Sequence, residues 1–201
     1  MLASITPLGE RGRNMRWSVT VAFYLLGSTL GGTALGGAAG VAGWLRRDLF
    51  GTSLGGPLLA VAVLSVAALA LDSGLAGRPV PTLHRQVNED WLGRYRGWVY
   101  GLSFGVQLGL GLVTTVSSAA VYVVVALAFL SPSMLVALLI GSSFGLARAL
   151  PVLLTASVAT PSSLTLFHQR LASWRGGVRA LTLILELSLG AAAALALAGT
   201  P

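Results

Sequence analysis

The chain has 201 residues, 55% hydrophobic and only 9% charged, with a formal net charge of +7. A soluble domain carries about a quarter charged residues, so a surface with this few could not be solvated, and the chain is predicted to lie in a membrane. The absence of cysteine excludes disulfides, dithiol redox chemistry and thiolate metal sites.

Five apolar stretches are long enough to cross a hydrocarbon core of about 30 Å, which takes roughly 20 helical residues. Each is expected to be helical, because unpaired backbone groups in lipid are costly. The predicted fold is therefore all-α, a polytopic integral membrane protein with about five transmembrane helices in a single domain covering residues 1–201. In chain order the stretches are Trp17–Leu45, Leu54–Gly77, Gly97–Leu130, Ser133–Ser157 and Gly177–Gly199.

The first stretch is rich in glycine and is longer than the apolar core of a cleaved signal peptide, so we expect it to be retained as a helix. Its glycines recur at spacings of four, which lets a second helix approach to backbone distance. A flexible helix beside a substrate path is the alternative interpretation, but we favour helix packing. The candidate packing residues are Gly27, Gly31, Gly32, Gly36 and Gly40.

The second stretch contains Asp72, which lies roughly 8 Å from the end of the stretch at about 1.5 Å per helical residue. There it could reach Arg78 or interfacial water. An ionisable residue in a membrane marks either a function or a buried pair. Because Asp72 lies near the end of its stretch, we favour a role at the helix end over that of a proton carrier.

Two polar connectors, residues 81–96 and 161–175, each begin with proline and place apolar residues at helical spacing opposite basic ones. These features are typical of an amphipathic helix that lies in the membrane interface. The connectors also resemble each other, with Thr82, His84 and Trp91 matching Thr165, His168 and Trp174. We therefore consider an internal duplication covering roughly residues 23–91 and 101–174, as is common in transporters. Chance similarity between apolar segments is the alternative.

The third stretch is too long for one simple span. It is predicted to be either one tilted or broken helix or two short helices. It also holds the polar residue Gln107, a further candidate for a transport or gating site. Its hydroxyl side chains could bond to backbone carbonyls and relieve a bend, which favours a break over Gly109–Ser118. Such a break supplies the exposed backbone dipoles of a transport site, or serves packing alone. The candidate residues of the break are Gly109, Gly111, Thr114 and Thr115.

The placement of arginine favours five spans with the N-terminus in the cytoplasm and the C-terminus outside. Arginines then concentrate on the cytoplasmic side, and only Arg46 and Arg47 lie outside, as the positive-inside rule requires. Dividing the third stretch into two spans would move Arg170, Arg175 and Arg179 outside.

Arg148 and Glu186 lie in the fourth and fifth stretches, each about nine residues from the inner end, which corresponds to a depth of roughly 13 Å. Because these helices are sequential and antiparallel, we predict a direct Arg148–Glu186 pair. The pair could be a clamp between the two helices, or a gate or a site for a substrate carboxylate, and both interpretations stay open.

Signatures of enzymes and cofactor sites are absent. The sequence has no phosphate-binding loop, no dinucleotide fingerprint and no nucleophile elbow, and its two histidines, His84 and His168, cannot alone build a metal site. We therefore expect a protein that is not an enzyme and that has no catalytic residues, no cofactor and no metal.

Two segments resemble the cytochrome c biogenesis (CcdA/DsbD-type) transmembrane family within the LysE-like transporter group. They are Tyr100–Gly109 (YGLSFGVQLG) and Phe144–Leu154 (FGLARALPVLL). The resemblance implies a scaffold of six helices that carries electrons through a dithiol. This chain has five apolar stretches and none of that family's redox cysteines, so only the scaffold could be shared.

Two functions fit these features. The first is a small transporter or permease of the bacterial inner membrane that moves or gates a small solute without redox chemistry. The second is a non-catalytic membrane subunit that docks in a larger complex and stabilises it. The expected partners are membrane lipids and other membrane subunits or further copies of the chain, and nucleic acid is not expected, because the arginines flank apolar stretches.

Overall fold

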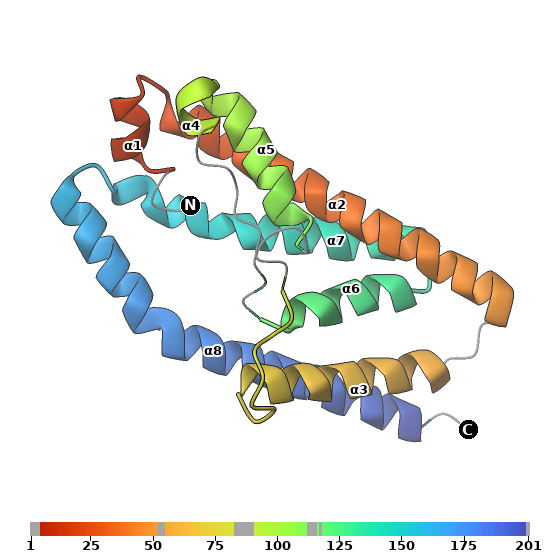
Figure 1. The fold of residues 1–201 in the computed structure, drawn as a ribbon. Coiled ribbons are helices and arrows are strands. Elements are labelled where there is room, and N and C mark those ends of the chain that lie inside the picture. Colours follow the sequence, from red (N-terminus) through yellow and green to blue (C-terminus); the bar gives the residue numbers. More distant parts are fainter. Residues whose placement is uncertain (1–4, 52–54, 83–90, 112–115, 117, 200–201) are drawn as a thin grey trace.

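The structure is a computed structural model that describes residues 5–51, 55–82, 91–111, 116 and 118–199. All of its regular elements in these ranges are helical, as predicted (Figure 1). They are α1 (Pro7–Gly12), α2 (Trp17–Phe50), α3 (Gly55–Asp72), α4 (Trp91–Arg94), α5 (Gly97–Gly109), α6 (Ala120–Leu130), α7 (Met134–Ala149), the 3-10 helix η1 (Leu150–Ser157) and α8 (Pro161–Ala198).

Four helical segments are long and apolar enough to cross a membrane, and the protein is a multi-pass membrane protein. They are Trp17–Leu49, Gly55–Asp72, Met134–Ser157 and Pro161–Ala198, and Ala120–Leu130 is a shorter apolar helix. Four of the five predicted spans therefore correspond to long helices. The remaining one, the third stretch, is divided between α5 and α6.

Helix α2 is the centre of the bundle and packs against α5 on one side and α7 on another. Glycines make this packing close. A Cβ atom at Gly27 would lie 3.0 Å from the Val106 nitrogen in α5, and one at Gly32 would lie 2.8 Å from the Gly145 Cα atom in α7. The contact with α7 also includes a hydrogen bond of 2.6 Å from the Ser28 hydroxyl to the Gly145 carbonyl oxygen. All five candidate packing glycines of α2 lie against α5 or α7.

The two halves of the third stretch lie end to end along α2. Gly31 of α2 contacts Val106 near the end of α5, whereas Gly43, further along α2, contacts Phe129 near the end of α6. Figure 1 shows α5 and α6 following one another beside α2. The third stretch is thus an interrupted helix, as the break over Gly109–Ser118 predicted.

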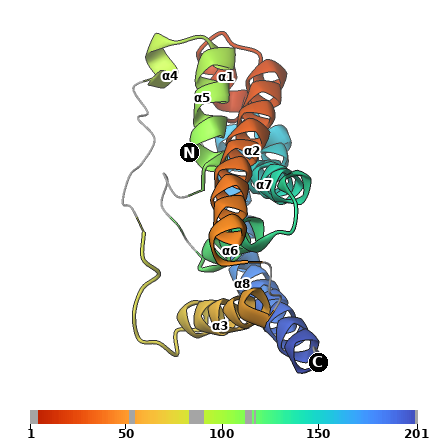
Figure 2. The ribbon, with the colours of Figure 1, turned by 90° about the vertical axis from the view of Figure 1, so that its right-hand side faces the viewer.

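Helices α3 and α8 form a second packed pair that joins the bundle through α6. Small residues line the contact, and a Cβ atom at Gly190 of α8 would lie 3.2 Å from the Ser65 Cβ atom of α3. Figure 2 shows this pair at one end of the molecule, apart from α1, α4 and α5.

The second predicted interfacial helix is not separate from the fifth span. Residues 161–175 are the first part of the 38-residue helix α8, which begins with a capping box in which Thr160 and Ser163 bond to each other's backbone. Gly176 and Gly177 do not end the helix, because a glycine costs only about 1 kcal/mol in a helix interior. Most of the first predicted interfacial helix lies outside the described residues, and only Trp91–Arg94 of it is seen, as α4.

Candidate functional site

The interruption between α5 and α6 begins at a turn centred on Gly111. The Gly111 amide donates to the Leu108 carbonyl oxygen, and its φ angle is +66°, in the left-handed region that favours glycine. A Cβ atom there would lie 2.9 Å from the Phe144 ring. Glycine fits both the backbone angle and the small space at position 111, and this allows the chain to turn away after the end of α5. Gly109, in contrast, packs against α2.

Arg148 of α7 contacts the end of α5. Its Nη1 atom donates to the Gly111 carbonyl oxygen at 3.2 Å, and its guanidinium lies 5.4 Å from the centre of the Phe144 ring. The end of a helix carries partial negative charge on its unpaired carbonyl groups, so a cation at this position stabilises it. The ring face adds a cation–π attraction.

Asp72, the last residue of α3, holds the beginning of α6. Its carboxylate accepts a hydrogen bond of 2.8 Å from the Ala119 amide and one of 2.6 Å from the Ser118 hydroxyl. The Val116 amide donates to the Thr82 hydroxyl at 2.7 Å. An acidic group at a helix N-terminus pairs free amides and opposes the positive end of the helix dipole.

Asp72 is therefore a helix-end residue, as expected, but its contacts differ from those that the sequence suggested. The sequence suggested contact with Arg78 or interfacial water, but the carboxylate is directed to the start of α6. Arg179 of α8 supports this arrangement by donating to the carbonyl oxygens of Asp72 and Ser73, at 3.1 and 2.9 Å.

The interrupted helix is thus held by opposite charges at its two inner ends, Arg148 at the end of α5 and Asp72 at the start of α6. Backbone that is not helical is tolerated at membrane depth only where protein surrounds it or where it lines a cavity. The two charged side chains supply part of that environment. The candidate functional site consists of the two half-helices α5 and α6 and the two charged side chains at their facing ends, Arg148 and Asp72.

Glu186 lies in the contact between α8 and α3 and is only 4% exposed. Within the described part of the chain, no side chain other than Asp72 bonds to its carboxyl oxygens. The charged group that acts on it is Asp72, a second carboxylate. The Ser65 hydroxyl, buried in α3, has no partner among the described residues.

The structure does not show the predicted Arg148–Glu186 pair. Arg148 contacts Gly111, whereas Glu186 is beside Asp72. Sequential antiparallel helices do not pack together here, because α7 packs on α2 and α8 packs on α3. Of the other candidates, Gln107 is a half-buried residue of α5, and Thr114 and Thr115 lie outside the described residues.

Sequence reasoning missed Glu10, a buried carboxylate in α1 that is 1% exposed. It accepts hydrogen bonds from Thr20 of α2 at 2.8 Å, from Arg13 at 2.7 Å and from the Tyr100 hydroxyl of α5. Burial lowers the pKa of Arg13, but its hydrogen bond with Glu10 and the nearby charges raise it overall. The cluster anchors α1 to α2 and α5. Only the position of an acidic residue among basic ones before the first span could have indicated it.

We expect Glu10→Gln to lower the free energy of unfolding by about 1.5 kcal/mol, because it removes the charge from buried hydrogen bonds. Thermal unfolding in mild detergent measures this. Asp48→Asn, at an exposed residue near the end of α2, is the control and should have no measurable effect. Equal stability of Glu10→Gln and the wild type would contradict the anchoring role.

Comparison with known proteins finds sequence similarity to MauF proteins. The chain is 34% identical over 138 residues to the methylamine utilization protein MauF of Methylobacillus flagellatus, covering 69% of the chain and 48% of that protein. It is 37% identical over 158 residues to the MauF protein of Paracoccus versutus, covering 75% and 56%, respectively. With the MauF protein of Methylophilus methylotrophus it shares 32% identity over 158 residues, covering 75% and 53%.

The chain thus spans about half the length of the curated relatives that it matches. No family model matches the chain, and no solved structure matches it. The resemblance to the CcdA/DsbD-type family and the LysE-like group is incorrect, because the homologues across most of the chain are MauF proteins. The two segments that suggested it are short and apolar. Tyr100–Gly109 forms most of α5, and Phe144–Leu154 spans the end of α7 and the first five residues of η1.

Proposed function

On the basis of this likeness to MauF proteins, we propose that the chain is a MauF-like membrane protein of methylamine utilization that moves a small solute across the membrane beside its interrupted helix. The relatives carry methylamine utilization in their names. The transport role is supported by the interrupted helix, which has a charged side chain at each of its inner ends. Interrupted helices of this kind form the binding sites of many transporters.

Glu186 is the residue that this proposal assigns to the moving solute or proton. An ionisable residue inside a membrane is expensive unless it is paired, and those that are kept mark ion or substrate pathways. Among the described residues, the polar partner of the Glu186 carboxyl group is a second acid, Asp72. A small cation or a proton is therefore the species that this part of the protein would accept. The proposal includes no enzymatic step and no bound cofactor.

The proposed orientation keeps the N-terminus and the basic end of the molecule in the cytoplasm, with the protein in the bacterial inner membrane. Helix α1 contacts the end of η1, since the Leu8 amide donates to the Val158 carbonyl oxygen at 3.1 Å. The segment before α2 and the beginning of α8 therefore lie at the same end of the molecule (Figure 1), and both carry arginines in the sequence. By the positive-inside rule, this end faces the cytoplasm.

Growth tests the role in methylamine utilization. Deleting the gene in its own bacterium should abolish growth on methylamine as the nitrogen source and leave growth on ammonium unchanged. The wild-type gene should restore growth. Normal growth of the deletion strain on methylamine would contradict this part of the proposal.

Reconstituted vesicles test the transport role. We expect uptake of labelled methylammonium, or proton entry measured with a trapped pH dye, above that of empty vesicles. Glu186→Gln should lower this flux at least about tenfold while melting like the wild type, since an amide keeps the shape of the side chain but cannot carry a proton or a charge. Ser188→Ala is the control on the same helix, because its hydroxyl bonds only to the Leu185 carbonyl oxygen among the described residues.

Equal flux in wild-type and empty vesicles would contradict transport of both probes. If the deletion strain still failed to grow on methylamine, the second function, a non-catalytic subunit of a larger complex, would be the better explanation. Mild-detergent purification at native expression would then be expected to yield partner proteins.

A further inference from the structure

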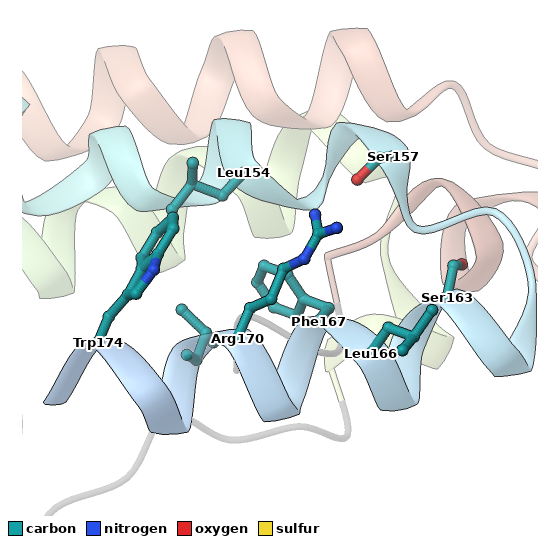
Figure 3. A pocket seen from close by; sticks show the side chains of 8 residues that line it. Leu154, Ser157, Ser163, Leu166, Phe167, Arg170 and Trp174 are labelled. Carbon is teal, nitrogen blue, oxygen red and sulfur yellow. The ribbon is translucent and has the colours of Figure 1, made fainter.

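A groove runs between the first half of α8 and the η1 segment. It consists of two cavities of about 410 and 500 Å³, and both are lined by Leu154, Leu171 and Trp174. The cavities are adjacent, because they share these side chains, and together they make up the groove. Figure 3 shows Leu154 on η1 facing α8, with Trp174 beside it. Volumes of this size are typical of ligand sites.

The floor of the groove is apolar and follows one face of α8. Phe167, Leu171, Trp174 and Val178 recur at spacings of three and four, so they lie on the same side of the helix. Leu154 and Trp174 stay 43% and 51% exposed, although α8 faces η1 here. The two elements therefore leave an apolar surface open along the groove.

The groove is also basic. Arg170 lines one cavity and Arg175 the other, and neither guanidinium makes a hydrogen bond or ion pair with the described part of the chain. Figure 3 shows Arg170 reaching from α8 toward η1, with its guanidinium near Ser157. The single acid of the lining, Asp72, accepts bonds from Ser118 and Ala119, and the third arginine, Arg179, donates to backbone carbonyl groups.

We propose that this groove binds one anionic phospholipid, attracted by the positive charge of Arg170 and Arg175, with an acyl chain along the apolar floor. Arginine is well suited to phosphate, because its planar group can donate two parallel hydrogen bonds. Basic pockets between membrane helices bind lipid head groups, and tryptophan is enriched at the membrane interface. A soluble anion would leave the apolar floor exposed, and a zwitterionic lipid would leave the positive charge without a counterion.

Native mass spectrometry of the purified protein with added phosphatidylglycerol or phosphatidylcholine tests the proposal. We expect the wild type to bind phosphatidylglycerol about twenty-five-fold more tightly, because each of the two arginines contributes a factor of roughly five. The double variant Arg170→Gln/Arg175→Gln should lose this preference. Arg11→Gln, at an exposed arginine of α1, is the control and should keep it.

A second double variant distinguishes loss of positive charge from misfolding. Arg170→Lys/Arg175→Lys keeps both charges and should retain most of the preference for phosphatidylglycerol. Equal binding of the two lipids by the wild type would overturn the proposal, as would an unchanged preference in the glutamine double variant. Displacement of the lipid by millimolar inorganic phosphate, or a peptide found in the groove in place of lipid, would also overturn it.

Discussion

Gly32→Ala is expected to lower the free energy of unfolding by about 3 kcal/mol or more and to reduce the amount of folded protein in the membrane. The added methyl group would overlap the Gly141 carbonyl oxygen and lie 2.8 Å from the Gly145 Cα atom. Both contacts are with backbone, which cannot move aside as a flexible side chain can. The α2 and α7 helices would have to separate, and their close packing would be lost along the interface.

Unfolding of the purified protein in mixed micelles, followed by circular dichroism, measures this effect. The matched control is Gly176→Ala, because a Cβ atom at Gly176 in α8 meets nothing within 4 Å. That substitution should be neutral or should stabilise the helix by about 0.5–1 kcal/mol, since alanine favours helix more than glycine does. Similar stabilities for the two variants would contradict the close contact of α2 with α7.

Asp72→Ala is expected to lower the free energy of unfolding by about 3 kcal/mol, and to abolish the proposed transport. It removes the acceptor for the Ala119 amide and the Ser118 hydroxyl, two donors at the beginning of α6. Both donors therefore lose their acceptor within the protein. The N-terminal end of α6 also loses the negative charge that opposes its dipole.

Asp72→Asn separates the two contributions, since an amide oxygen still accepts one hydrogen bond but carries no charge. It should lose about half as much stability as Asp72→Ala. Asp48→Ala, at an exposed acid near the end of α2, is the control for removal of a carboxylate. Limited proteolysis near the start of α6 would show local opening in Asp72→Ala. If Asp72→Ala unfolded like the control, the carboxylate would not hold α6.

Much of the fold could be predicted from the sequence because lipid leaves few choices. An apolar stretch of sufficient length must be a helix, since each backbone group in lipid needs a partner within the segment. This argument predicted α2, α3, α7 and the second part of α8, and it placed the break before α6. The glycine spacing of α2 also indicated a packing face, because spacings of four place glycines on one side of a helix.

Hydropathy says little about which helices are neighbours, because every lipid-facing side is equally apolar. The prediction for Arg148 and Glu186 depended on neighbours and assumed that α7 lies beside α8. In the tertiary structure α2 lies between α5 and α7, and α8 packs on α3. This arrangement brings Arg148 to the end of α5 and leaves Glu186 beside Asp72.

The sequence by itself therefore determined that this protein spans a membrane with helices, and where one of them breaks. Only the tertiary structure decided what holds the break, because Asp72 and Arg148 reach it from two helices that are far apart in the chain. The physical reason is that helix formation depends on local hydrogen bonds, whereas helix packing depends on which small side chains let two backbones come close.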